Sequence, residues 1–515
     1  MCNDRDTLLS SDLYEHRPDD ELAQHFTPAC VARRVWQIVR KRSGRALAGQ
    51  PRVIDLAAGA GAWLDAVLEG GDVQGTDAHG IEIDPRWQVR SGVSHTGDGL
   101  LGQFPAVEDG SFDAVLGNPP FGKLAAFRAA MGDPATQALA ARFQLWDVMG
   151  NGASSFPVEW LFVERALQVV RPGGWVALIL PEGLLANARW QKARDWLLER
   201  AQLTDVVGLP AAVFRGSGLN ARTAFIVFQK GANRAMRRVR LAGVKGSETN
   251  VDVDAYLRQV RDGRGVNVCS MSVQQRRLVG RRWDRGYWRG AAHVRQLARR
   301  FGLRPLGDFI EHLTYGPIIT GRKPEHIEGG IPVIRQGDIA ETGLEESALL
   351  RVEMRGDFDP QRSRVKRGDW LLPRSGAGAL GRNRTAVYGG RSQANIGCFV
   401  DLVRLRGINP YYAWFFFKTP MGWEQIAALI NGVGTPNINF GEIRSLAVIE
   451  APEQVQQAVE WRYRREVLPW HRRRLRSAQA RDQSEQYFRA IVRDLQRFLS
   501  GDMREPFLVG DTGAA

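Results

Sequence analysis

The stretch FDAVLGNPPF, residues 112–121, joins a short apolar run to two consecutive prolines. The run FDAVLG predicts a buried strand because it is short, apolar and ends at a glycine. Proline has no N–H group and a fixed φ angle, so Asn118, Pro119, Pro120 and Phe121 are expected to form a stiff loop after that strand. Ligands bind beyond the carboxyl ends of strands in open α/β sheets. The same residues could also form a loop that only ends the strand. The neighbouring segments must therefore distinguish a ligand-binding loop from a simple strand end.

Strands and helices alternate around this stretch, from about residue 25 to residue 230. Helical patterns such as VEWLFVERALQVV separate the candidate strands. Repeated strand–helix units at this spacing predict an α/β fold with a mostly parallel sheet, closed by an antiparallel hairpin at its last two strands. The further candidate strands are RVIDLA (52–57), GIEID (80–84), WVALILP (175–181), TDVVGLP (204–210) and TAFIVFQ (223–229).

The composition and the hydrophobic pattern of the sequence change after residue 230. We expect residues 1–230 to form the α/β domain and the Arg- and Gly-rich residues 231–280 to form a connector. Short strands broken by glycines, such as GGIPVIRQGDI, predict a mixed α/β domain over residues 281–450. Two long amphipathic patterns then predict a helical region over residues 451–515.

The net charge of +14 lies entirely in the second half of the chain. Residues 1–230 carry 23 Lys and Arg against 26 Asp and Glu, and residues 231–515 carry 47 against 30. An excess of arginine confined to one half predicts a polyanionic partner contacted through that half. A solvated surface in an Arg-rich protein is the alternative.

Cysteine and histidine usage argues against a metal site. The four cysteines form no CxxC pair and the eight histidines form no cluster with them, so we expect no metal. No apolar run approaches the ~20 residues that span a bilayer, and the polar N-terminus has no signal core. These features predict a cytoplasmic protein without a membrane partner.

Acidic residues follow the first three candidate strands in the pattern of a nucleoside site. The segment Asp55-Leu-Ala-Ala-Gly59-Ala-Gly61 places a glycine turn between a strand and a helix, where a ligand can lie against bare backbone. Glu82 ends the next strand and can accept both ribose hydroxyls of an adenosine, although Asp77 competes for that role. Asp98 follows the third strand and can accept a hydrogen bond from an exocyclic amine.

These residues favour S-adenosyl-L-methionine over a nucleotide. The region is net negative and has no Lys–Ser/Thr pair for phosphate, whereas a cationic sulfonium tolerates acidic surroundings. Leu64 stands where a dinucleotide fingerprint requires a small residue. The segment SGAGALGRN (375–383) imitates a phosphate loop but has Arg382 and Asn383 in place of Lys and Ser/Thr, which excludes ATP use there.

The order His-Phe26-Thr27-Pro28, then Asp55…Gly59-x-Gly61, GIEID, Asp98 and Asn118-Pro119-Pro120-Phe121 resembles the gamma class of adenine-N6 DNA methyltransferases over residues 22–230. The resemblance implies a Rossmann-like fold that binds S-adenosyl-L-methionine. It implies that Thr27 lies by the methionine end of the cofactor and that Phe162 packs on its adenine. It implies further that Asp55, Gly59 and Gly61 lie along the cofactor, with Glu82 on the ribose and Asp98 on the adenine.

The Asn-Pro-Pro-Phe loop suits attack by an exocyclic amine. Two acceptors, the Asn118 side-chain carbonyl and the Pro119 main-chain carbonyl, can face the two N–H bonds and aim the lone pair at a methyl carbon. Such positioning contributes up to ~7–11 kcal/mol. The target base must leave the duplex, and stacking on Phe121 returns roughly 1–3 kcal/mol. By resemblance, a second aromatic ring contacts the base, and Phe214 is the candidate.

The basic half resembles one target-recognition unit of type I restriction specificity subunits, a unit also fused in single-chain (type IIG) restriction–modification enzymes. The segments RPLGDFIEHLTYGPIITGRK, IPVIRQGDI, VKRGDWLLPRSGAGALG and GTPNIN carry this resemblance over residues 281–500. It implies that double-stranded DNA is the partner. About 25 residues precede Phe26, too few for a nuclease domain, so we expect modification without cleavage and a separate nuclease or defence partner, if any. Candidate DNA contacts are Arg322, Lys323, Arg335, Arg374, Arg382 and Arg384.

Several alternatives remain open at this point. Release-factor glutamine methyltransferases also use Asn-Pro-Pro with an aromatic residue, but they lack the Phe-Thr-Pro segment and a basic domain of this size. Cytosine N4 or RNA could be the target, and a DNA-binding module with an inactive catalytic half is a third class. The most economical prediction is a monomeric, site-specific adenine-N6 DNA methyltransferase that serves restriction–modification, phage defence or epigenetic marking.

Overall fold

The computed structural model describes residues 25–503 except 72, 123–140, 150–155, 211, 215–221, 232–236, 246–250, 377, 391 and 431–436. The chain divides into two compact units, unit 1 (Met1–Arg285) and unit 2 (Gly286–Ala515). Part of the expected GTPNIN segment lies outside the described residues. No helix in the described part is long and apolar enough to cross a membrane.

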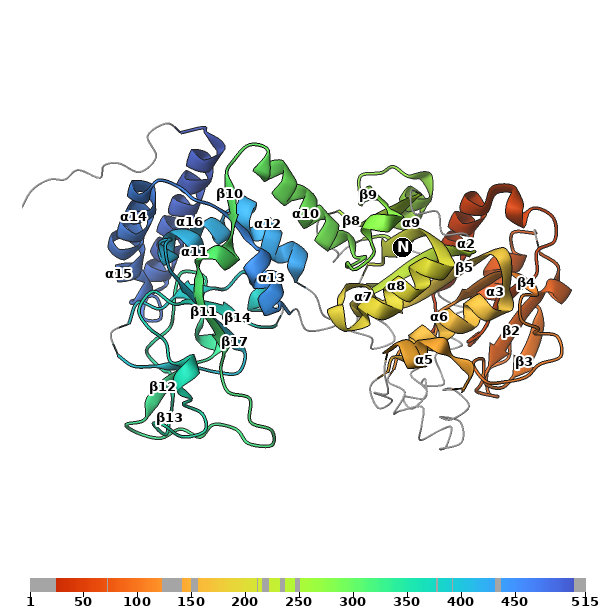
Figure 1. Cartoon of the computed structure of the whole chain (residues 1–515), viewed down its shortest axis with the longest axis horizontal. Coiled ribbons are helices and arrows are strands. Elements are labelled where there is room, and N and C mark those ends of the chain that lie inside the picture. Colours follow the sequence, from red (N-terminus) through yellow and green to blue (C-terminus); the bar gives the residue numbers. More distant parts are fainter. Residues whose placement is uncertain are drawn as a thin grey trace, which may run out of the picture. The chain divides into compact units, whose positions relative to one another are not determined.

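Unit 1 is built on a nine-stranded sheet with the order β3-β2-β1-β4-β5-β7-β6-β8-β9 (Figure 1). Strands β3, β2, β1, β4 and β5 are parallel, whereas β7 is antiparallel to both β5 and β6. The Rossmann-like sheet and the antiparallel pairing of β6 with β7 are therefore as predicted, but the sheet continues beyond this pair. The strands are β1 (Val53–Asp55), β2 (Ala78–Glu82), β3 (Val93–Thr96), β4 (Phe112–Gly117), β5 (Val170–Pro181), β6 (Ala201–Gly208), β7 (Thr223–Lys230), β8 (Arg238–Val244) and β9 (Val268–Gln274).

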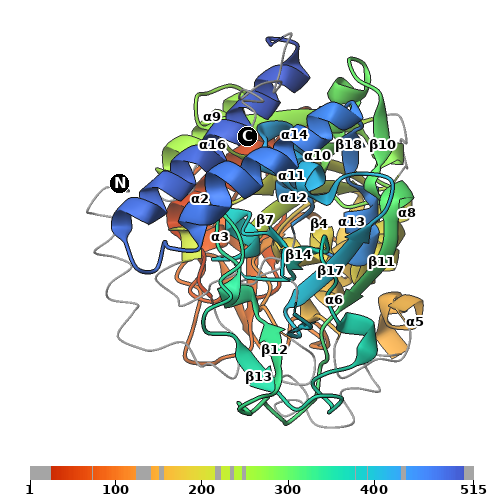
Figure 2. The same cartoon turned by 90° about the vertical axis from the view of Figure 1, so that its left-hand side faces the viewer.

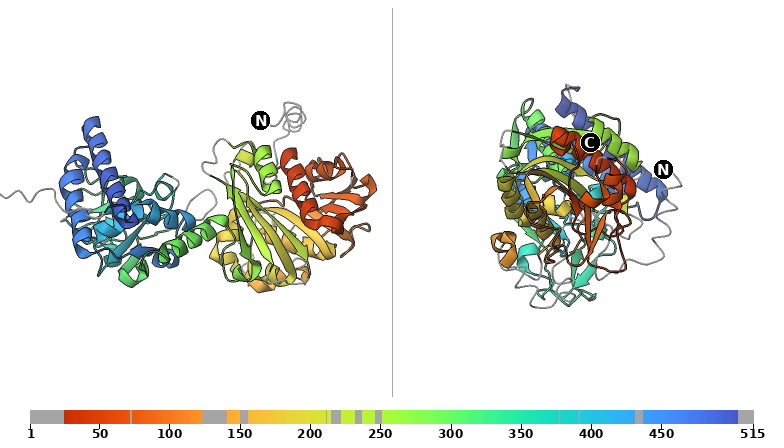
Figure 3. Two further views of the ribbon diagram at one scale, coloured as in Figure 1. Left: turned by 90° about the horizontal axis from the view of Figure 1, so that it is seen from above. Right: turned by 90° about the vertical axis from the view of Figure 1, so that its right-hand side faces the viewer.

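Helices cover the sheet of unit 1, which explains why its central strands are apolar throughout (Figure 3). Every residue of β1 is buried, and β4 is buried except at Asp113. Helices α2, α3 and α9 contribute to one core cluster with these strands. Helix α6 packs on β4 and β5, and α8 packs on β6. The helices are α2 (Ala29–Ser43), α3 (Ala62–Leu68), α5 (Gln144–Met149), α6 (Val158–Val169), α7 (Glu182–Ala186), α8 (Gln191–Arg200) and α9 (Val253–Asp262).

The segment 231–280, expected to be a connector, instead extends the sheet of unit 1. Strand β8 pairs in parallel with β6, and β9 pairs with β8 at the edge. Tyr256, Leu257 and Val260 of α9 are buried in the same core as α2. An edge strand with one exposed face carries polar residues, as β9 does, so its weak apolar pattern concealed it. Unit 1 therefore extends beyond the expected boundary at residue 230, to Arg285.

Unit 2 holds three small sheets (Figure 2). Four strands pair in the order β11-β17-β14-β15, three pair as β13-β12-β16, and β10 pairs with β18. The glycine-bounded segments expected to be strands form β12, β14 and β17. The strands are β10 (Leu303–Pro305), β11 (Ile310–Tyr315), β12 (Ile331–Ile334), β13 (Leu350–Val352), β14 (Trp370–Pro373), β15 (Ala386–Val387), β16 (Asn395–Ile396), β17 (Val400–Leu405) and β18 (Ala447–Ile449).

The C-terminal helices share one core with these sheets. Helix α11, which contains the run YYAWFFF, is buried along most of its length and packs against both α14 and α16. A single cluster of buried residues joins Trp370 of β14, Trp414 of α11 and Phe488 of α16. Residues 451–503 therefore belong to unit 2. The helices are α10 (Arg285–Ala298), α11 (Pro410–Lys418), α12 (Pro420–Leu429), α13 (Phe440–Ser445), α14 (Glu453–Arg462), α15 (Leu468–His471) and α16 (Ala478–Ser500).

Candidate active site

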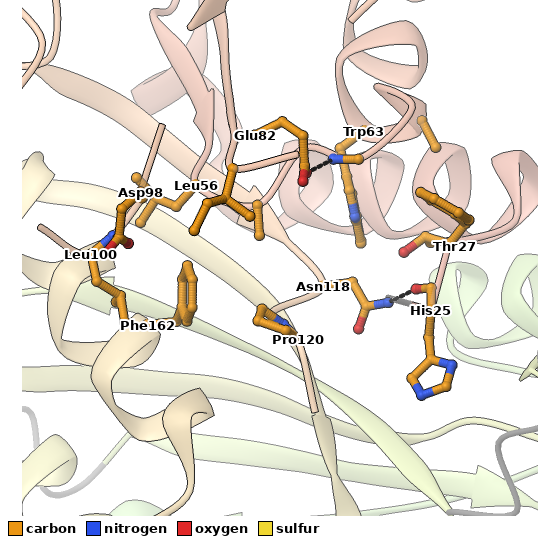
Figure 4. A pocket seen from close by; sticks show the side chains of 16 residues that line it. His25, Thr27, Leu56, Trp63, Glu82, Asp98, Leu100, Asn118, Pro120 and Phe162 are labelled. Atoms are coloured by element: carbon orange, nitrogen blue, oxygen red, sulfur yellow. Dashed lines mark hydrogen bonds between the residues drawn. The ribbon is translucent and has the colours of Figure 1, made fainter. Parts of the chain in front are cut away.

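A pocket in unit 1 lies at the carboxyl ends of β1, β2 and β4, where open α/β sheets bind ligands. Figure 4 shows Asp98, Leu100 and Phe162 at one end of it and Thr27, Trp63 and His25 at the other. The empty space within it, including open solvent at its mouth, is about 810 Å³. The lining residues are His25, Phe26, Thr27, Leu56, Ala57, Gly59, Ala62, Trp63, Glu82, Ile83, Asp98, Gly99, Leu100, Asn118, Pro120 and Phe162.

The turn after β1 has glycines at the two positions where the backbone adopts positive φ angles. Gly59 and Gly61 both adopt positive φ angles, +50° and +89°, which favour glycine. A Cβ atom on Gly59 would lie 2.9 Å from Cε1 of Phe26, so only a hydrogen fits under that ring. Gly61 caps the N-terminus of α3. The turn therefore leaves bare backbone along the pocket wall at Gly59.

Glu82 is held in the pocket wall by two backbone donors. Its Oε2 accepts a hydrogen bond from the Gly59 N–H at 2.7 Å, and its Oε1 accepts one from the Asp84 N–H at 3.0 Å. The side chain is buried, and this burial raises the pKa of Glu82 although the hydrogen bonds oppose the shift. The carboxylate is thus fixed in place and still has lone pairs to offer a ligand hydroxyl.

Asp55, expected to lie along the cofactor, is not among the residues that line the pocket and lies behind its wall. Its Oδ1 accepts a hydrogen bond from the Ala57 N–H at 3.0 Å, and its Oδ2 has no partner among the described residues. Burial raises the pKa of Asp55 to about 8, and the Glu82 carboxylate adds to this shift. Oδ1 also occupies the space that a Cβ on Gly117 would need, 2.9 Å away. Asp55 therefore packs directly beneath the loop that begins at Asn118.

Asn118 has a fixed orientation and an unused acceptor. Its Nδ2 donates to the main-chain carbonyl of His25 at 2.7 Å, which sets the amide so that Oδ1 points away from this bond. That Oδ1 is buried and has no hydrogen-bond partner among the described residues. Pro120 lines the pocket beside Asn118, whereas Pro119 is buried and does not. An unsatisfied buried acceptor on a pocket wall costs free energy unless a ligand donates to it.

The expected adenine end of the pocket brings Asp98 and Phe162 together. Oδ1 of Asp98 accepts a hydrogen bond from the Leu100 N–H at 2.8 Å, which fixes the loop after β3. Gly99 lies against the Leu56 carbonyl, where a Cβ atom would lie 1.9 Å from the oxygen, and beside the ring of Phe162. Ile83 is 40% exposed although it directly follows the buried strand β2, and it offers an apolar face to the pocket.

The two aromatic candidates for base contact differ in position. The ring of Phe121 is half-buried between His25, at a centroid distance of 5.9 Å, and Phe214, at 6.3 Å. Phe214 is only 3% exposed and belongs to the core of unit 1. Neither ring lines the pocket, and Phe214 lies edge-on behind Phe121.

Residues 14–259 match the model of the N-6 DNA methylase family, and this match contains the whole pocket. This similarity agrees with the resemblance to adenine-N6 DNA methyltransferases that the ordered motifs of the sequence carry. No curated protein matches the sequence.

Solved structures similar to the chain include restriction–modification proteins. The type IIG restriction endonuclease BpuSI is 14% identical and has a TM-score of 0.46, with 92% of this chain aligned to 66% of that one. The type IIL enzyme MmeI in complex with DNA is 10% identical, with 99% and 76% coverage and a TM-score of 0.48. A type I modification subunit from Vibrio vulnificus is 17% identical, with 52% and 59% coverage and a TM-score of 0.39. The chain thus spans about two thirds of BpuSI and less of the type I subunit.

The expected DNA contacts of unit 2 fall in different surroundings. Arg322 pairs with Asp357 at 2.8 Å, and both side chains are exposed. Arg335 pairs with Asp338 at the end of β12, beside a pocket that also includes Phe399. Lys323 is exposed in the same long loop as Arg322.

The other three candidates lie after β14. Arg374 is half-buried, with its guanidinium 4.1 Å from the ring centroid of Tyr315, and it is thus partly a packing residue. Arg382 is exposed and lines a different pocket from Arg335, while Arg384 is half-buried. The structure therefore does not gather the six basic residues into one site.

Some pocket residues of the methylase unit were not predicted. His25 contributes its main-chain carbonyl to Asn118, and Trp63 lines the pocket with its indole N–H unpartnered among the described residues. Two features of the sequence could have indicated these residues. His25 directly precedes the Phe-Thr-Pro segment, and Trp63 lies at the start of the helix that follows the glycine turn. Leu56, Ile83 and Leu100 each follow or precede a predicted acidic site residue and were overlooked because they are apolar.

A buried carboxyl group supports the Asn-Pro-Pro-Phe loop from the first turn of α6. Glu159 is 3% exposed and forms a hydrogen bond with the backbone of Gly122, and the Val158 N–H donates to the Gly122 carbonyl at 3.3 Å. Its Oε2 has no partner in the described part of the chain. Burial raises the pKa of Glu159 to about 8, so the group is mostly protonated at neutral pH.

We expect Glu159→Gln to make the stability of the protein less dependent on pH. The folded wild type keeps a proton that the unfolded chain loses above its ordinary carboxyl pKa, so wild-type stability falls as pH rises from about 4.5 to 8. A neutral glutamine has no such proton to lose. Thermal unfolding at several pH values between 5 and 8.5 measures the slope. The exposed control Glu108→Gln should follow the wild type, and an unchanged slope in Glu159→Gln would refute the protonated state.

Proposed function

We propose that this chain transfers a methyl group from S-adenosyl-L-methionine to N6 of an adenine flipped out of a specific site in duplex DNA. The observation that carries the proposal is the buried, unpartnered Oδ1 of Asn118 on the pocket wall. The fused basic unit suits a restriction–modification, phage-defence or epigenetic role in the cytoplasm, where DNA is accessible.

The chemistry of the pocket lining supports S-adenosyl-L-methionine as the cofactor. Gly59 leaves bare backbone, Glu82 offers fixed acceptors for ribose hydroxyls, and Asp98 stands at the far end for the adenine amine. Phe162 and Ile83 provide apolar surface for the adenine ring. Glu82 adds an acidic group to the wall of a pocket proposed for a ligand that carries a positive charge. When bound, the cofactor supplies an electrophilic methyl group.

The chain's own residues prepare the attacking amine. Oδ1 of Asn118 accepts a hydrogen bond from one N–H of the adenine amine, and the main-chain carbonyl of Pro119 accepts a hydrogen bond from the other N–H. These two acceptors draw the nitrogen lone pair out of the ring and toward the methyl group, and they stabilise the positive charge that develops on N6. The hydrogen bond to His25 and the two prolines fix the acceptors before the reaction, so little reorganisation is needed. The N6 proton is lost to water afterwards, so no strong base is required.

Phe121 is the proposed stacking partner of the flipped base. Extrusion of a paired base costs a few kcal/mol, and stacking on an aromatic ring returns roughly 1–3 kcal/mol. Phe214 packs edge-on behind this ring and is proposed to support its position. Unit 2 is proposed to recognise the duplex, with Arg322, Lys323, Arg335, Arg382 and Arg384 as its candidate contacts and Arg374 in a mainly structural role.

The deciding experiment is a methyl-transfer assay with radiolabelled cofactor and three acceptors: duplex DNA, total RNA and a glutamine-containing peptide. We expect label in DNA alone. Chromatography and mass spectrometry of the digested DNA should identify N6-methyladenine. Label in N4-methylcytosine, RNA or peptide would replace the proposal by that alternative, and duplex binding without any transfer would indicate an inactive specificity module.

We expect methylation on one strand of a non-palindromic site. A two-fold symmetric site is read by a symmetric dimer or by two recognition units, whereas this chain carries one catalytic loop and one recognition-like unit. Strand-resolved mapping of methyl groups in the DNA of an expressing host, together with the mass of the protein in solution, tests this. A palindrome methylated on both strands by a monomer would contradict it.

A further inference from the structure

A second pocket, in unit 2, is lined by an unusual concentration of basic side chains. It lies between α16, the junction of α11 with α12, and the turn that contains Arg382. Hereafter it is called the basic pocket. Among its lining residues Glu341 is the only acid, and five side chains are basic: Arg382, Lys418, Arg489, Arg493 and Arg497.

Three of these arginines form a row on α16. Arg489, Arg493 and Arg497 follow one another at four-residue intervals, so they lie on one face of the helix about 6 Å apart along its axis. All three are exposed. Phe488 lies beside the row in the pocket wall and is buried in the core of unit 2, which anchors the helix beneath it. The row therefore presents three guanidinium groups over about 12 Å on a rigid support.

The opposite wall of the basic pocket is also rigid. Lys418 donates a hydrogen bond from Nζ to the main-chain carbonyl of Asn383, and its ammonium lies 5.9 Å from the ring centroid of Trp414. Asn383 adopts a left-handed backbone with φ of +54°, and its Nδ2 donates to the Phe417 carbonyl at 3.0 Å. These bonds tie the turn of Arg382 to the end of α11, so Arg382 also has a fixed support. Burial lowers the pKa of Lys418 to about 7, so this amine is only partly charged at neutral pH and the arginines carry most of the charge.

The positive charge of the basic pocket is not balanced within the described residues. Arg489 pairs with Glu485 at 2.9 Å and reaches Glu341 at 3.8 Å. Arg493 reaches only Asp494, at 3.9 Å, and no carboxylate in the described part of the chain pairs with Arg382 or Arg497. Like charges held together at a fixed distance repel one another, and an anion bound between them relieves this cost.

We infer that the basic pocket binds the phosphate backbone of duplex DNA, as a contact that only positions the duplex. The inference rests on the proposed function, because it takes DNA as the substrate. A row of cations about 12 Å long exceeds the size of one phosphate group and suits consecutive phosphates of a strand. Arginine is also the side chain that binds phosphate oxygens through two parallel N–H groups. Such contacts set affinity and register and carry no sequence information.

The test is the salt dependence of duplex binding by the full chain carrying Arg493→Gln and Arg497→Gln together. Each lost phosphate contact reduces the slope of log K against log [salt] by about 0.9, so the double variant should lose about 1.8 from the slope. Fluorescence anisotropy with a labelled duplex between 50 and 200 mM KCl measures it. Arg444→Gln on α13 removes an equally exposed charge of unit 2 outside the basic pocket and should leave the slope unchanged.

The outcomes separate this inference from the proposed function. A double variant with an unchanged slope overturns the inference, even if it methylates DNA normally. Inorganic phosphate or ATP that binds the wild type and not the double variant, while duplex binding stays equal, also overturns it and assigns the pocket to a small phosphate ligand. If the double variant shows the expected loss of slope but the wild type transfers no methyl group to DNA, the inference is supported and the proposed function is refuted.

Discussion

Replacement of Asn118 by alanine is expected to abolish methyl transfer while the protein still folds and binds its cofactor. The substitution removes Oδ1, the buried acceptor proposed for the adenine amine, and leaves the glycine turn and Glu82 in place. Loss of one fixed group that stabilises developing charge costs about 10²–10³-fold in rate. The bond from Nδ2 to the His25 carbonyl is lost as well, so the loop is less ordered and the decrease should reach at least that range.

Single-turnover kinetics with saturating DNA and cofactor should show this loss in the chemical step. Calorimetry with S-adenosylhomocysteine should show affinity within about threefold of the wild type. Asn187→Ala is the matched control, because Asn187 is exposed in unit 1 and caps a short helical turn away from the pocket. If Asn118→Ala lost cofactor binding in parallel with transfer, Asn118 would be a cofactor residue and its proposed role would be wrong.

Glu82→Gln should weaken cofactor binding about 10- to 100-fold and leave DNA affinity nearly unchanged. Hydrogen bonds to a charged acceptor contribute about 1.5–3 kcal/mol, and this substitution removes the charge proposed to hold the ribose. It also presents an amide N–H₂ to the Gly59 or Asp84 N–H group, both of which now donate to the carboxylate. Two donors facing each other are repulsive, so the glycine turn should loosen too.

Titration calorimetry with the wild type, Glu82→Gln and Asp77→Asn distinguishes the two acidic candidates for the ribose. Asp77 is half-buried and does not line the pocket, so Asp77→Asn should bind the cofactor like the wild type. Equal affinity in Glu82→Gln and the wild type, with a loss in Asp77→Asn, would transfer the ribose role to Asp77.

The sequence predicted the strands of unit 1 well because buried parallel strands are short apolar runs and their carboxyl ends carry polar residues. This rule located Glu82, Asp98 and Asn118, which line one pocket. It did not show that Asp55 lies behind the pocket wall, because a residue at a strand end can point behind the wall instead of into it, and sequence order does not give the direction. It failed for β8 and β9 because edge strands carry alternating polar residues that resemble a connector.

Unit 2 was less predictable for a physical reason. Its strands are short and contribute to one core with helices far away in sequence, so their pattern depends on tertiary contacts. The positions of charged residues in the sequence gave even less information about which of their side chains are free to bind a ligand. Arg322 and Arg335 have acidic partners, and Arg374 packs on Tyr315. The amino-acid sequence alone does not distinguish an arginine that has such a partner from one that does not. The row on α16 was overlooked for the same reason.

The extension of the first sheet by β8 and β9 sets the place at which the chain can be cut and rejoined. The last strand, β9, ends at Gln274, and the Arg285 side chain donates to the Val244 carbonyl of β8 at 3.2 Å, so the chain contacts the sheet as far as Arg285. A chimera joined at residue 231 would lose β8, the parallel neighbour of β6, and expose the edge of β6. A junction after Arg285 keeps all nine strands. If unit 2 is the recognition unit proposed above, a replacement from another protein should therefore be joined at that position.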